Sequence, residues 1–435
     1  MTTAVTVPVP DTGPAARSEV REWARRAGAL SPVLAVIALL LVPGGGGAQG
    51  GTGGSGTVAD AASGLLVLIC LLRVVRGGAR PLTRAAAVVL GLPVFGVCLA
   101  AITSNDPGAS LPGVARYLQI FVLVPGAVLV MIRDRRDFAV VAWGLVGLAL
   151  LEGGVGVLQF LTGTGASYQG ADVRAVGTFG ATDVMGMATV VAYGLVIAAG
   201  LALGGRAGSR ARTAALVCAG VLFLPLVLSF SRGAWIATVL AVGLQLLLAG
   251  PRLAARVALA GAALGVVLVG GFGIGSDMVK ERVTSITQVA AAPDQSVTDR
   301  YTMWAAAGRM WRSEPLTGVG LKGFPAYRDS NASLALSSGS DTAGAGAAFA
   351  RQPLLSPHNM YLLILSEQGL FGLLALAGSW AALLVAALRR RRLGPARRAR
   401  AGQAAGSGAV HRKAPERVGI GGIETLPPPR GGGGP

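Results

Sequence analysis

The stretch TAALVCAGVLFLPLVLSFSRGAWIATVLAVGLQLLL, Thr213–Leu248, decides the fold class of this chain. It holds two apolar runs, and the polar residues Ser231, Arg232 and Gly233 separate them. Both runs are close to the roughly 20 residues that an α-helix needs to cross a membrane. A guanidinium group keeps its proton, so Arg232 is costly at membrane depth unless it faces a partner, a cavity or an anion. The stretch therefore predicts a tight pair of membrane-spanning helices with Arg232 at the turn between them.

The composition of the whole chain also indicates a membrane protein. Its 435 residues are 52% hydrophobic and only 13% charged, which is too apolar for a soluble domain of this length. The net charge of +18 would suit nucleic acid, but the basic residues lie in short clusters between apolar runs, without interleaved aromatic residues. We therefore predict an all-α, polytopic integral membrane protein that does not bind nucleic acid.

About ten apolar stretches are predicted to span the membrane. Arginine-rich segments alternate with acidic or neutral ones between them, and the excess of positive charge in cytoplasmic loops then places both termini in the cytoplasm. The first stretch is short and follows Arg25 and Arg26, so a cleaved signal peptide is an alternative interpretation of it. The predicted spans are residues 29–42, 58–72, 85–102, 117–132, 138–161, 184–203, 213–230, 234–248, 257–275 and 360–388.

This topology divides the chain into three parts. Residues 1–28 form a cytoplasmic N-terminal segment, residues 29–388 form the polytopic membrane domain, and residues 389–435 form a basic, disordered cytoplasmic tail. Between the last two spans lies one long extracytoplasmic loop, residues 276–357, and loops of such length are commonly functional. Within it, residues 299–312 mix aromatic and basic side chains in a pattern typical of an amphipathic helix at a membrane surface.

His358 is the candidate for proton transfer. The chain has two histidines, and His411 lies in the basic tail, whereas His358 follows Pro357 where the long loop meets the last span. An imidazole is the side chain best suited to exchange a proton near neutral pH. The alternatives are a structural histidine at the membrane interface and, for Arg232, an arginine that contacts lipid headgroups.

Other polar residues are predicted near the same outer boundary. Arg174 and Asp183 lie in the loop between the fifth and sixth spans, and Asp183 suits the N-cap of the next helix as well as it suits catalysis. Glu367 lies within the last span and is expected to need a partner, for which an arginine is a candidate. The cysteines, Cys70, Cys98 and Cys218, all lie in apolar runs, so neither disulfides nor a metal site is predicted.

The glycines of residues 318–323 fit the pattern of a dinucleotide site, but no strand precedes them. Together with Pro315 they indicate a turn that returns the long loop to the membrane.

Four segments, in this order, resemble the O-antigen ligase-like family, which includes O-antigen ligases, related polysaccharide polymerases and some protein oligosaccharyltransferases. They are R-x-x-G-T-F at residues 174–179, S-R-G-A-W at 231–235, R-x-x-x-W followed by P-x-x-G-x-G-x-x-x-F within 300–324, and H-N-x-x-L followed by E-x-G-L-x-G within 358–372. One difference is Asp183, because many relatives have an asparagine shortly after the G-T-F element.

The resemblance implies a glycosyltransferase of the inner or plasma membrane, without cofactor or metal. Its donor would be a glycan linked to a polyprenyl diphosphate, and its acceptor a hydroxyl group of a glycan, a lipid or a protein. Arg232 and His358 would be catalytic, with Arg232 on the diphosphate and His358 on the acceptor. The residues implied in substrate binding are Arg174, Arg300, Asn359 and Asp183.

Two other functions stay open on the sequence alone. One is a transporter or permease for a small solute or a lipid-linked glycan, and the other is a structural membrane protein. Transporters commonly carry ionisable residues near the midplane, whereas here they gather at the outer boundary, with Glu152 and Glu367 as the main exceptions. This distribution favours the transferase, and we expect its arginines and His358 to converge on one pocket at the outer rim of the membrane.

Overall fold

The computed structural model describes residues 14–42, 57–77, 82–104, 106–166, 173–180, 184–205, 208–266, 295–333 and 356–410. Within these ranges the regular structure is helical, and the only β-type contact is one isolated bridge between Ala166 and Arg174. The all-α prediction is therefore confirmed.

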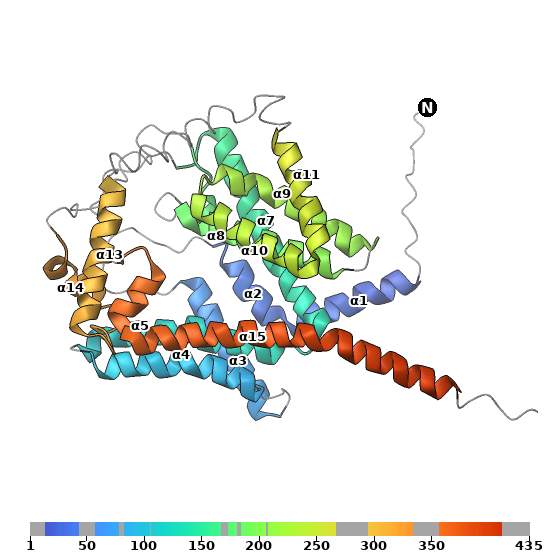
Figure 1. The fold of residues 1–435 in the computed structure, drawn as a ribbon, viewed down its shortest axis with the longest axis horizontal. Coiled ribbons are helices and arrows are strands. Elements are labelled where there is room, and N and C mark those ends of the chain that lie inside the picture. The colour runs from blue at the N-terminus through green and yellow to red at the C-terminus, as the bar shows by residue number, and fades with distance from the viewer. Residues whose placement is uncertain are drawn as a thin grey trace, which may run out of the picture. The chain divides into compact units, whose positions relative to one another are not determined.

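Figure 1 shows the helices of the described residues. They are α1 (Pro14–Ala29), α2 (Ser31–Leu39), α3 (Val58–Val75), α4 (Arg84–Ile102), α5 (Pro107–Leu118), the π-helix η1 (Gln119–Leu123), α6 (Val124–Met131), α7 (Arg135–Thr162), the 3-10 turn η2 (Gly177–Phe179), α8 (Val184–Gly204), α9 (Arg210–Leu228), α10 (Arg232–Ala249), α11 (Pro251–Val266), α13 (Gln295–Ser313), α14 (Phe324–Asn331) and α15 (Met360–Val410).

Eight helical segments within the described ranges are long and apolar enough to cross a membrane, and they match eight of the ten predicted spans. They are Val58–Val75, Arg84–Ile102, Ser110–Met131, Arg135–Thr162, Met185–Gly204, Arg210–Leu228, Arg232–Ala249 and Met360–Arg389. The protein is thus a multi-pass membrane protein. The count of ten stays a prediction, because α2 has only nine residues and residues 267–275 lie outside the described ranges.

The helices α7, α8 and α9 pack closely around small residues. A methyl group added to Gly194 of α8 would lie 2.2 Å from Cβ of Ala149, and one added to Gly153 of α7 would lie 2.7 Å from Cγ of Pro225. Neither position has room for a side chain. Small residues that let helix backbones approach are typical of helix contacts within membranes.

A second core joins α13, α14 and the first turns of α15 (Figure 1). The α13 helix confirms the helix predicted over residues 299–312. Its buried face presents Met303, Ala306 and Met310, which pack against Phe324 at the start of α14. This core places the N-terminus of α15 beside α13.

The last helix has two distinctive features. Its backbone leaves the helical region at Gly369, where φ is 63° and ψ is −163°. The helix then extends to Val410, so residues 389–410 are helical where the sequence predicted the beginning of a disordered tail. Alanine and arginine, which are frequent there, both have high helix propensity. Residues 411–435, with His411, lie outside the described residues, and Trp380–Pro435 form a unit distinct from Met1–Ser379.

Candidate active site

Two polar side chains of α7 hold the R-x-x-G-T-F element. The carboxylate of Glu152 accepts hydrogen bonds from the hydroxyl group of Thr178 at 2.6 Å and from its backbone amide at 3.0 Å. The Gln159 side chain accepts hydrogen bonds from the amides of Val176 and Gly177 at 3.1 and 2.9 Å, and it donates one to the Gly177 carbonyl at 2.9 Å. Five hydrogen bonds thus fix this short turn to one helix.

The G-T-F turn needs its glycine for two reasons. Gly177 has a φ of +64°, which disfavours any side chain, and a Cβ there would lie 2.3 Å from Oε2 of Glu152. Glu152 is completely buried, and a buried carboxylate is tolerated only where hydrogen bonds replace its hydration. The two bonds from Thr178 supply that replacement.

Arg174 lies just before this turn and next to the end of α9. The backbone of Arg174 pairs with Ala166, with N to O distances of 2.7 and 3.0 Å. The amide of Ala175 donates a hydrogen bond to the carbonyl of Leu228 at 3.1 Å. This bond ties the segment of Arg174 to the turn between α9 and α10, which carries Arg232.

The S-R-G-A-W element forms that turn. Ser231 caps α10, because its hydroxyl group accepts a hydrogen bond from the Ala234 amide at 3.3 Å. The indole of Trp235 donates a hydrogen bond back to the Leu226 carbonyl at 2.7 Å. Arg232 is the first residue of α10, and its side chain is exposed. The predicted turn is therefore present, with its arginine at the positive end of a helix.

His358 lies beside α13. The indole of Trp304 donates a hydrogen bond to the Pro357 carbonyl at 2.8 Å, which fixes the residue before the histidine. His358 itself has a φ of 50°, a backbone conformation uncommon for residues with side chains. The R-x-x-x-W spacing puts Arg300 one helical turn before Trp304 on the same face of α13. The motif thus places a guanidinium group near the imidazole.

The surroundings of His358 favour its neutral form. The imidazole reaches solvent, yet the protein around it and the charge of Arg300 both lower its pKa below the ordinary 6.5. Burial is the larger of these two causes. A neutral ring is the form that can accept a proton.

The other two predicted substrate residues have different outcomes. Asn359 caps α15, because its side-chain oxygen accepts hydrogen bonds from the amides of Tyr361 and Leu362 at 3.0 and 3.2 Å. This role was not expected from the sequence. Asp183 lies outside the described residues.

The segment from Pro315 to Phe324 docks against the break in α15. At Gly369 the helix exposes backbone groups, and the segment pairs with them: Leu370 N to Pro315 O at 2.9 Å, Phe371 N to Leu316 O at 3.1 Å, Val319 N to Ser366 O at 2.9 Å and Gly320 N to Glu367 O at 3.1 Å. The predicted turn therefore returns the long loop to the last span.

Glu367 completes this docking, but not with the arginine considered from the sequence. The side chain is buried, and its Oε1 accepts a hydrogen bond from the backbone amide of Phe324 at 3.1 Å. On the other side of the segment, Leu321 packs against Val97, Ala100 and Tyr117 of α4 and α5. The P-x-x-G-x-G and E-x-G segments therefore fix residues 315–324, which follow the helix of Arg300, to the last span.

The structure thus relates the predicted residues in two pairs, the first through the backbone of their segments and the second through the charge of Arg300. The segments of Arg174 and Arg232 are joined by a backbone hydrogen bond, and Arg300 lies close enough to His358 to lower its pKa. Convergence of both pairs on one pocket stays a prediction. The sequence did not predict that Glu152 and Gln159 position the G-T-F turn. A glutamate within an apolar span did indicate that Glu152 needs a polar partner.

Comparison with known proteins concerns the sequence of the chain. No curated protein matches the chain. A family model described as O-antigen ligase matches residues 214–377, a range that contains three of the four motif segments and omits only R-x-x-G-T-F. This match confirms the resemblance of the chain to the O-antigen ligase-like family, whose members are membrane glycosyltransferases of the ligase or polymerase type.

Proposed function

We propose that this protein transfers a glycan from a polyprenyl-diphosphate carrier to an acceptor hydroxyl group at the extracytoplasmic face of the inner or plasma membrane, with both of its own termini in the cytoplasm. The observation that carries the proposal is the exposed Arg232 at the N-terminus of α10, bonded through its turn to the segment of Arg174. Two fixed cations and a helix N-terminus are what a leaving diphosphate requires.

The reaction exchanges one carbon–oxygen bond for another. The acceptor oxygen attacks the anomeric carbon, and the bond from that carbon to the diphosphate breaks with its electron pair on the diphosphate oxygen. Arg232, with Arg174 as a second cation from the segment bonded to the same turn, stabilises the negative charge that develops there. The positive charge comes from arginine side chains, so the proposal requires neither a metal ion nor a cofactor.

His358 is proposed as the group that takes the proton of the acceptor hydroxyl. Its lowered pKa keeps it neutral at neutral pH, and Arg300 next to it would contact the donor phosphate. Asn359 uses its side-chain oxygen to cap α15, so a substrate contact would come from its amide nitrogen. Asp183, which follows the G-T-F element in the sequence, is proposed to contact the substrate. The acceptor is a glycan, a lipid or a protein.

The test is transfer by the purified protein in liposomes that contain a polyprenyl-diphosphate-linked glycan. Arg232→Ala and His358→Ala should each lower the rate by about a hundredfold or more, as loss of a transition-state contact does. Arg252→Ala is the control, because Arg252 is also an exposed arginine near a helix N-terminus. Normal turnover of both variants would refute the proposal. Movement of the lipid-linked glycan across the bilayer, without release of polyprenyl diphosphate, would support a transporter instead.

A further inference from the structure

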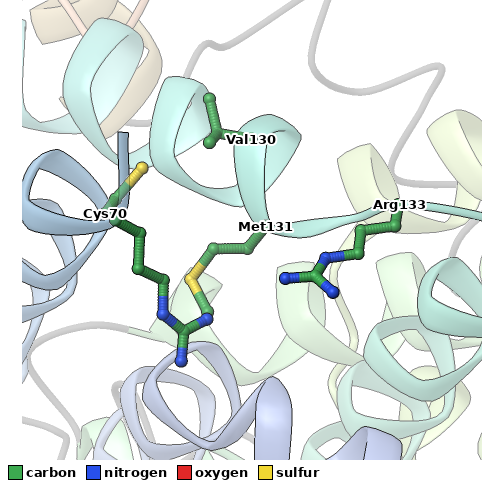
Figure 2. Close-up of a pocket in the computed structure, with 5 residues that line it drawn as sticks. Cys70, Val130, Met131 and Arg133 are labelled. Carbon is green, nitrogen blue, oxygen red and sulfur yellow. The ribbon is translucent and has the colours of Figure 1, made fainter. Parts of the chain in front are cut away.

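A small cavity with two arginines is lined by none of the residues of the candidate active site. Cys70 and Arg73 of α3, Val130 and Met131 of α6, and Arg133 after α6 line it. Figure 2 shows the guanidinium group of Arg133 directed toward Met131. The cavity lies where both helices end, at the side on which the sequence predicts the arginine-rich segments to gather.

The carboxylates nearest in sequence to Arg133 are already bound by other arginines. Arg26 forms ion pairs with Asp134 at 2.8 Å and with Asp137 at 2.7 Å. Arg136 and Arg26 both bind Glu22, at 2.7 and 2.9 Å. These pairs tie α1 to the beginning of α7.

The two arginines of the cavity have no such partner. In the ranges given above, neither Arg73 nor Arg133 forms an ion pair, and Arg73 donates only a long hydrogen bond of 3.3 Å to the Ala29 carbonyl. Two guanidinium groups beside one cavity repel each other unless an anion lies between them. Their planar donors suit a phosphate group, which they can bind through two hydrogen bonds each.

The surface next to the cavity indicates what carries that phosphate. The walls of the cavity include the apolar side chains of Cys70, Val130 and Met131, and the apolar Val74, which follows Arg73 on α3, is exposed. Acyl chains would cover this surface, whereas a free phosphate ion would leave it bare. Basic pockets between membrane helices are known sites for anionic lipid headgroups.

We propose that Arg73 and Arg133 bind the headgroup phosphate of an anionic phospholipid. The site is separate from the glycosyltransferase reaction, so it stands or falls independently of the proposed function. The lipid would neutralise the two charges and hold the ends of α3 and α6 together.

The test uses the full-length protein, purified in detergent and freed of lipid, with phosphatidylglycerol as the probe and native mass spectrometry as the readout. The double variant Arg73→Gln and Arg133→Gln should bind phosphatidylglycerol at least about tenfold more weakly than the natural protein. Arg76→Gln is the matched control, because Arg76 is exposed at the same end of α3 and does not line the cavity. Its affinity should be unchanged.

Three results would overturn the proposal. Equal affinity for phosphatidylcholine would show that the anionic charge is not recognised, and an equal loss in Arg76→Gln would show that only overall charge matters. Complete displacement of phosphatidylglycerol by inorganic phosphate would assign the cavity to the free ion. If the double variant does not fold, Arg133→Gln alone serves, since this side chain makes no hydrogen bond within the described part of the chain.

Discussion

Replacement of Gly369 by alanine should destabilise the protein strongly. Gly369 has a φ of +63°, and a Cβ atom there would lie 2.3 Å from the carbonyl carbon and oxygen of Leu316. Because the neighbouring atoms belong to the backbone, no side-chain rotation relieves the clash. The strained backbone conformation costs about 1–3 kcal/mol, and loss of the two hydrogen bonds from Leu370 and Phe371 adds about 1 kcal/mol each. We expect a total loss of about 3–5 kcal/mol.

Gly378→Ala is the control for this prediction, because it lies in the same helix and its added methyl group would meet nothing closer than Leu92 at 3.9 Å. There alanine should be neutral or should stabilise the helix by up to about 1 kcal/mol. The assay is thermal unfolding of both variants in detergent, together with limited proteolysis between residues 315 and 324. The docking of this segment on α15 would be refuted if Gly369→Ala unfolded at the temperature of the natural protein and showed no new cleavage.

Three further predictions concern the candidate site. Glu152→Ala leaves two partly buried donors of Thr178 without a partner and should lower the free energy of unfolding by about 2–4 kcal/mol, measured by thermal unfolding. A smaller loss in Thr178→Val would agree, and no loss in either variant would contradict the role of Glu152. Ser231→Ala removes the cap of α10 and should cost about 1 kcal/mol in the same assay, an unchanged value counting against the cap. Arg300→Gln removes one cause of the lowered pKa of His358, so the acid limb of the kcat/KM profile should move to higher pH; an unmoved limb would argue against proton transfer by His358.

The sign of the pH dependence follows from the direction of the shift. The folded protein disfavours protonation of His358, so the neutral ring contributes stability above the ordinary pKa of 6.5, and this contribution is lost as the pH falls below that value. Activity that depends on the neutral ring should persist at neutral pH and decline only in more acidic buffer.

The sequence was sufficient for the features that depend on local pattern. The apolar runs around Arg232 predicted a pair of helices and a turn, because length and hydropathy alone decide whether a segment can span a membrane. The amphipathic helix containing Arg300 and the turn after Pro315 follow from short-range spacing in the same way.

The roles that depend on contacts between distant residues were not predictable. Glu152 contacts Thr178 across 26 positions of the chain, and nothing in the local pattern identifies that partner. A glycine such as Gly369 within an apolar run is compatible with a continuous helix, so the break becomes visible only with the docked segment in place. Asn359 was assigned to substrate, but the adjacent helix start gives its oxygen a structural task.

The contact of Gly153 with Pro225 sets a limit on how this protein can be redesigned. Gly153 directly follows Glu152, so a bulkier residue at this depth would separate α7 from α9 and move the carboxylate away from the turn that it holds. Under the proposed function, changes of substrate preference are therefore better sought at exposed positions outside the catalytic set than along this helix contact. Libraries that vary the buried seam would mostly return misfolded protein, whatever glycan is offered.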